Sequence, residues 1–144
     1  MEQSHQKTFS LEEANRIVPF LSSAFTEIFA LNQSARSLDM DINDLVEIWG
    51  EEVTMQGHVD HEIYRERMER RKDMHKRGHE IFDTIFQTGA VIKDTDTGLV
   101  DFYSKQGDDL IMLCWKFGED RIKFWHPVST GFSKRKPVDE LRKR

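Results

Sequence analysis

The sequence holds a single cysteine, only three prolines in 144 residues, and no apolar run long enough to cross a membrane. One cysteine excludes an internal disulfide and is typical of a protein from a reducing compartment. The first five residues also lack the basic and then apolar pattern of a secretory signal peptide. These absences predict a cytoplasmic protein without a membrane partner.

The sequence also has fewer basic residues (21) than acidic residues (26). The net charge at pH 7 is −5, with 33% of residues charged and 38% hydrophobic. Phosphate binding needs concentrated positive charge, so this balance argues against nucleic acid as a partner. The charges are unevenly spread, however: residues 39–52 are acidic, whereas residues 65–79 and the tail at 128–144 are basic. Opposed blocks of this kind are typical of solvated helix faces or of self-association.

The clearest helix start lies at Ser10 and Glu13, which match a capping box, with Phe9 one residue before it in the position of a hydrophobic staple. Apolar residues then recur at steps of three and four, which predicts an amphipathic helix that ends near Ser37. Pro19 lies inside this pattern and predicts a kink, because proline removes one backbone hydrogen bond.

Two more helices are expected before the pattern changes. A short amphipathic piece covers about 41–54, and a long helix covers about 59–88. The middle of the long helix, 65–79, offers little apolar surface, so we expect it to project from the core or to pack on another subunit. The long helices would form an antiparallel hairpin over about 9–88, and the protein would be a homodimer.

The period of the pattern becomes two after Gly89, which is the signature of strands. Strands are predicted at 90–93, 99–103, 110–117 and 121–126. Short connections between successive strands favour an antiparallel β-meander of three to four strands over about 90–127. Helices followed by strands make this a single α+β domain with a basic C-terminal tail.

Alternation along the third predicted strand places Cys114 and Lys116 on one face of the sheet, and Asp101 of the second strand joins them. A tight turn after Phe117 would put Trp125 beside Cys114. A turn one residue longer would exchange the two faces of the fourth strand. His126 is expected near the edge of the sheet.

These residues define a candidate binding site on the meander. Strands disfavour aspartate, so Asp101 needs a partner, for which Lys116 or Arg135 would serve. The other members have plainer alternatives, since cysteine and tryptophan are frequent core residues and a histidine before proline is often only hydrogen-bonded. The full candidate set is Asp101, Cys114, Trp115, Lys116, Glu119, Trp125, His126 and Arg135.

A second candidate site lies on the long helix. His75 and His79 are four residues apart, a spacing that puts two imidazoles on one helix face, where they could hold zinc. Nearby lysines and arginines oppose a metal ion there, and a solvated or interfacial helix face is the alternative.

The same stretches resemble a known family. The segments 98–102, 113–119, 125–126 and 131–137, together with the opening 9–15 and Pro19, are similar to DUF2203, a prokaryotic family of unknown function. The region 38–80 diverges from it, and the family tends to carry proline at the position of Tyr103 and arginine at that of Lys116. The resemblance implies the extent of the domain but no activity, cofactor or catalytic residue.

Three classes of function follow. We favour a non-enzymatic binding or regulatory module that self-associates through its helices and presents the meander to an unknown protein or small molecule. One alternative is a small enzyme with Cys114 as nucleophile or His126 as general base and Asp101 orienting it. Another is a metal-binding protein that uses either the His75–His79 pair or Asp101, Cys114 and His126. No cofactor is predicted for the binding or regulatory module. The metal-binding alternative implies zinc or another divalent metal.

Overall fold

The computed structural model describes residues 7–143 and divides the chain into two compact units. The hairpin unit is Thr26–Phe82, and the sheet unit combines residues 7–25 with the chain from Asp83 onward. The expectation about the first five residues lies outside the described chain. Helix α1 (Leu11–Trp49) and helix α2 (His61–Gln87) each run from one unit into the other.

Helix α1 begins at the predicted capping box, which is confirmed. The backbone N–H of Ser10 donates to Glu13 Oε1 at 2.8 Å, and the N–H of Glu13 donates to Ser10 Oγ at 3.0 Å. These bonds satisfy two of the backbone donors that a helix start leaves free. The helix passes through Pro19 without ending there.

The predicted end near Ser37 and the separate helix at 41–54 are wrong. Buried Leu38 and half-buried Ile42 continue the apolar stripe, so α1 runs without a break to Trp49. A 3₁₀ helix, Gly50–Thr54, then closes the turn and buries Val53. The long second helix is confirmed as α2 (His61–Gln87).

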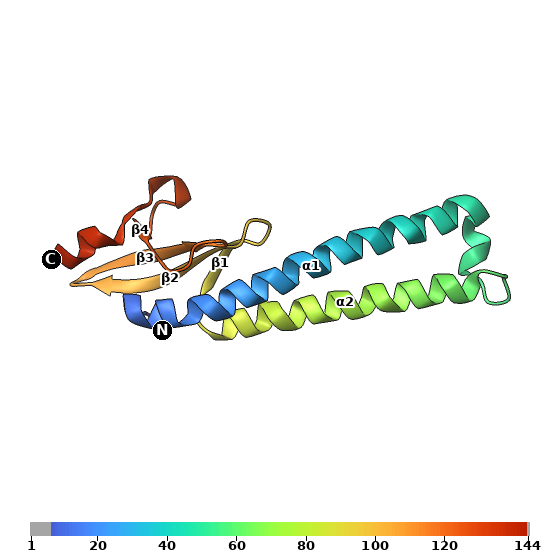
Figure 1. Cartoon of the computed structure of the whole chain (residues 1–144), viewed down its shortest axis with the longest axis horizontal. Helices are drawn as coiled ribbons and strands as arrows, with labels where there is room; N and C mark the ends of the chain where they lie inside the picture. Colours follow the sequence, from blue (N-terminus) through green and yellow to red (C-terminus); the bar gives the residue numbers. More distant parts are fainter. Residues whose placement is uncertain (1–6, 144) are drawn as a thin grey trace. The chain divides into compact units, whose positions relative to one another are not determined.

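In the hairpin unit α1 and α2 lie side by side and antiparallel (Figure 1). The opposed charge blocks pair across the two helices. Arg77 donates two hydrogen bonds to Glu27 at 2.7 and 2.9 Å, and Arg71 donates one hydrogen bond to Asp39. Part of the basic block is therefore neutralised within the chain.

The sheet unit holds one antiparallel sheet whose strands lie in sequence order, β1 to β5. Figure 1 labels β1 to β4. The strands are β1 (Val91–Asp94), β2 (Leu99–Gln106), β3 (Asp109–Lys116), β4 (Phe124–Pro127) and β5 (Lys136–Pro137). The α+β class and the meander are confirmed, but the sheet has five strands rather than three to four. The fifth comes from the predicted tail, which returns to pair with β4.

One face of the sheet carries the core that packs against the start of α1. Phe9 meets Phe102 edge to face with ring centroids 5.1 Å apart, and Phe25 lies 6.2 Å from Trp115. Phe25, Phe102 and Trp115 are fully buried. Burying a side chain of this size contributes about 2–3 kcal/mol, so this face is the main source of stability in the sheet unit.

The register of β4 corrects the sequence prediction. Cys114 lies opposite Phe124, and Leu113 lies opposite Trp125, so Trp125 belongs to the helix-covered face. The chain before β4 is held out of the ladder, because the N–H of Ile122 donates to Asn15 Oδ1 at 2.7 Å. The predicted strand at 121–126 therefore begins only at Phe124, and Trp125 does not lie beside Cys114.

Candidate metal-binding site

The other face of the sheet gathers three chemically active side chains. Asp101 of β2 lies directly opposite Cys114 of β3, and His126 of β4 lies opposite Met112 on the same face. All three are buried, with at most 1% of each residue exposed. One donor atom from each side chain lies within 4.8 Å of the other two, which defines the buried triad Asp101–Cys114–His126.

Hydrogen bonds fix the orientation of the His126 ring. Its Nδ1 lies 2.7 Å from the carbonyl oxygen of Pro127, and its Nε2 lies 2.9 Å from Asp101 Oδ2. A carbonyl oxygen only accepts, so Nδ1 carries a proton. The other ring nitrogen, Nε2, therefore faces the Asp101 carboxylate. In a neutral imidazole protonated at Nδ1, Nε2 and Asp101 Oδ2 each offer a lone pair with which to bind a metal ion.

Burial also governs the other two members of the triad. Asp101 Oδ1 has no hydrogen-bond partner among the described residues, although it is buried. Burial, and after it the neighbouring Asp101 carboxylate, raise the pKa of the Cys114 thiol, whereas Arg135 lowers it, and the resulting pKa is about 12. The thiol is therefore protonated at neutral pH, and the site holds an unused carboxylate oxygen next to a neutral sulfur.

A segment of the tail lies over Phe124, the residue opposite Cys114 in the sheet. The guanidinium of Arg135 lies between two aromatic rings, 4.1 Å from the centroid of Phe124 and 4.1 Å from that of Phe132. It also donates to both carboxylate oxygens of Glu119, at 3.0 and 3.3 Å. We call Phe132–Arg135 the strap; its Arg135 lies near enough to Cys114 to lower the pKa of the thiol.

The remaining predicted site residues lie elsewhere. Lys116 is exposed, with its ammonium 5.4 Å from the Phe132 ring, and Trp115 lies on the helix-covered face. Neither Lys116 nor Arg135 is the partner of Asp101; that partner is His126, which is buried rather than placed at an edge. Glu119 lies beside the strap, where its carboxylate accepts a hydrogen bond from Arg135.

Sequence reasoning missed Phe124 and Phe132 as parts of this region. Phe124 was assigned to the opposite face by the wrong register, and Phe132 lies in a stretch with no periodicity. The signal that could have found Phe132 is its place three residues before Arg135, since arginine stacks readily on aromatic rings.

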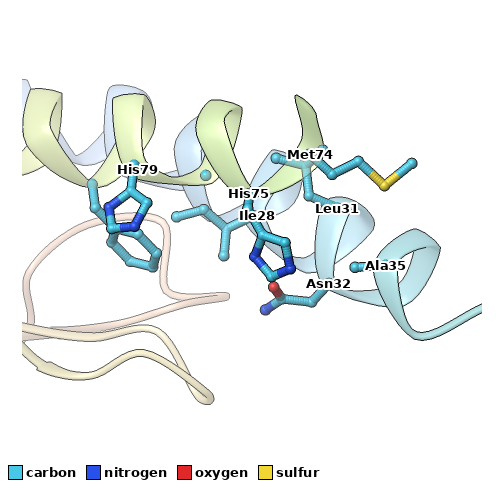
Figure 2. Close-up of a pocket in the computed structure, with 9 residues that line it drawn as sticks. Ile28, Leu31, Asn32, Ala35, Met74, His75 and His79 are labelled. Carbon is cyan, nitrogen blue, oxygen red and sulfur yellow. The ribbon is translucent and has the colours of Figure 1, made fainter. Parts of the chain in front are cut away.

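The second predicted site, on α2, is a shallow pocket of the hairpin unit. His75, His79 and Asn32 line it (Figure 2). Phe82 and Gly78 line it as well, and a Cβ on Gly78 would meet nothing within 4 Å. Both histidines are exposed, and no third residue with metal-ligating chemistry joins them within the described chain. The buried triad is therefore the stronger candidate for a metal site, because it brings three possible ligands together.

The triad fits a divalent ion of zinc type with small adjustments. Ligand atoms about 2.0–2.3 Å from a tetrahedral ion stand roughly 3.3–3.7 Å apart. The 2.9 Å contact between His126 and Asp101 would open by several tenths of an ångström, and the widest pair would close by up to about 1 Å. The bond from His126 Nδ1 to a backbone carbonyl is the support that ligating histidines normally have.

Comparison with known proteins defines the class of this α+β protein. A family model described as "Uncharacterized conserved protein (DUF2203)" matches residues 7–138, and the chain belongs to this family. No curated protein and no solved structure gave a match. Among the described helices, none has the length and apolar character that a membrane span requires.

Proposed function

We propose that this protein is a non-enzymatic metal-binding module that holds one zinc-type divalent ion on Asp101, Cys114 and His126. The observation that carries the proposal is the convergence of three different ligand types in one buried place, within 4.8 Å of each other. A thiolate and an imidazole favour borderline ions such as zinc, and three protein ligands leave one coordination position for water or another donor.

Charge balance supports a bound divalent ion. A carboxylate, a thiolate and a neutral imidazole sum to a charge of about −2, which a divalent cation would cancel. Arg135 adds no net charge to the site, because Glu119 neutralises it. The ion would also give a partner to Asp101 Oδ1. A reducing cytoplasm, in which a lone thiol stays available to metal, suits this role.

The same geometry disfavours the enzymatic alternative. A nucleophilic cysteine needs a depressed pKa, whereas burial raises that of Cys114 to about 12. A general base needs a free ring nitrogen, whereas both nitrogens of His126 are engaged. With no open approach to either group, binding fits the site better than turnover.

Cobalt titration of the purified chain tests the proposal. We expect one ion per chain and a thiolate-to-cobalt charge-transfer band in the near ultraviolet, with zinc displacing the cobalt. Asp101→Asn, Cys114→Ser and His126→Gln should each weaken zinc binding at least tenfold. A variant with both His75→Gln and His79→Gln is the matched control and should keep full affinity. Loss of binding in that control, with the triad variants unaffected, would overturn the proposal.

A further inference from the structure

The hairpin turn is an exposed apolar surface. Around the end of α1 and the start of α2, five large apolar side chains are open to solvent, although the turn buries only Val53. Their exposed fractions range from 41% to 79%. Exposed apolar patches rimmed by polar residues often mark interaction sites. The members are Ile48, Trp49, Met55, Val59 and Ile63.

The charges around this surface have one sign. Residues 37–64 contain aspartate and glutamate but no lysine or arginine. Asp44, Glu47, Glu51 and Glu52 are exposed and form no ion pair within the described chain. The turn therefore presents apolar surface inside an uncompensated acidic rim.

The complementary surface lies on α2 of the same unit. Met68, Lys72 and Lys76 follow each other at steps of four, so they form one stripe along the helix. Met68 is 37% exposed and lies in an open depression. Three basic side chains, one histidine and one carboxylate line it as well: Arg65, Arg71, Lys72, His75 and Glu69. Among residues 7–143, Lys72 and Lys76 have no ion-pair partner, unlike Arg71 and Arg77.

We propose that the protein is a two-fold homodimer in which the acidic turn of each copy docks on the Met68–Lys72–Lys76 stripe of the other. The stripe begins at the eighth residue of α2, so an antiparallel overlap of roughly 10–25 Å brings each turn onto its partner's stripe. A two-fold axis makes both contacts at once, because an isologous interface repeats each pairing.

A second copy fits this surface better than a nucleic acid or an anionic membrane. Both of those are polyanions, which the acidic rim of the turn would repel. The arginines that would have attracted them, such as Arg71 and Arg77, already pair with Asp39 and Glu27. What remains is one acidic and one basic surface on the same unit, which complement each other between copies.

Charge reversal with complementation tests the interface. One variant carries Glu51→Lys and Glu52→Lys in the turn, and the other carries Lys72→Glu and Lys76→Glu on the stripe. We expect a dimer for the unchanged chain in sedimentation velocity at low salt, and dimer dissociation constants at least tenfold higher for each variant alone. An equimolar mixture of the two should restore a heterodimer, since both of its contacts again join opposite charges.

The control is Lys93→Glu with Lys105→Glu, two exposed lysines of the sheet unit, which should leave the dimer unchanged. Circular dichroism of each variant reports whether the helices remain folded. The inference is overturned if the unchanged chain is a monomer, if either reversal leaves the dimer intact, or if the folded variants stay monomeric when mixed. The test does not involve metal, so its result is independent of the triad.

Discussion

His126 Nε2 lies 2.9 Å from Asp101 Oδ2, in a place where at most 1% of either residue is exposed to solvent. The other ring nitrogen, Nδ1, lies 2.7 Å from the carbonyl oxygen of Pro127, which can only accept a hydrogen bond from it. The two residues come from β2 and β4 and meet across β3, so their pairing also joins three strands. Removing only one partner of such a buried pair lowers stability strongly, because the other polar group stays buried without a partner.

The pair predicts unequal effects of two substitutions. His126→Ala leaves the Asp101 carboxylate buried without a partner and should lower the free energy of unfolding by about 3–5 kcal/mol. Asp101→Asn keeps a donor facing His126 Nε2 and should cost only about 1 kcal/mol. Urea unfolding of the metal-free variants measures both. Equal losses would contradict the expectation that a carboxylate buried without a partner is the larger cost.

Zinc binding should release a proton from the Cys114 thiol, whose pKa of about 12 keeps it protonated at neutral pH. This group alone should make the affinity rise about tenfold per pH unit. Calorimetry in buffers of different ionisation enthalpy counts the released protons. Cys114→Ser, which lacks the thiol, is the control and should release one proton fewer.

The raised pKa of Cys114 also makes stability fall in alkali. Above pH 9.0 the unfolded chain loses the thiol proton while the folded chain retains it up to about pH 12. The unfolded state then binds fewer protons, so the free energy of unfolding should fall with rising pH by up to about 1.4 kcal/mol per unit. Cys114→Ala should remove this part of the slope between pH 9 and 11. Parallel slopes in both proteins would contradict the prediction.

Opening the strap should expose the thiol. Arg135→Ala removes the stacking on Phe124 and Phe132 together with the bonds to Glu119, so Cys114 should react with a disulfide reagent such as DTNB at least tenfold faster. Arg135→Lys keeps the charge but loses the planar stacking, so its thiol should react at a rate between those of the unchanged protein and Arg135→Ala. Lys134→Ala, an exposed neighbour, is the control and should react at the original rate.

Two glycines in turns of the sheet unit should differ in their tolerance of a side chain. Gly98 has φ of 75°, and a Cβ there would lie 2.7 Å from the Cβ of Phe117. Gly107 has φ of 62° but meets nothing within 4 Å. Gly107→Ala should cost about 1 kcal/mol from backbone strain, whereas Gly98→Ala should cost clearly more through the added clash. Thermal unfolding would rank them.

The sequence allowed the local features to be predicted with good accuracy. Ser10 and Glu13 marked the start of α1, because a capping box depends only on residues three apart. The first three strands followed from alternation and from turn residues such as Gly98. Asp101 and Cys114 were placed on one face correctly, since their connection from β2 to β3 is short.

Contacts between distant residues set the features that the sequence did not predict. The start of β4 depends on Asn15, which holds the N–H of Ile122 from the far end of the chain. That bond moved Trp125 to the helix-covered face and Phe124 to the triad. The pairing of His126 with Asp101 depends on this register, so no local pattern could have indicated it.

The division of the sheet unit into two stretches of chain has a consequence for biosynthesis. Phe9 and Phe25 leave the ribosome early, but Phe102 and Trp115, which cover them, are made only after the whole hairpin. At roughly 5–20 residues per second the early side chains wait for several seconds. During that interval the first turns of α1 expose their apolar stripe, so nascent chains would be most vulnerable to aggregation and most dependent on chaperones just before the sheet is complete.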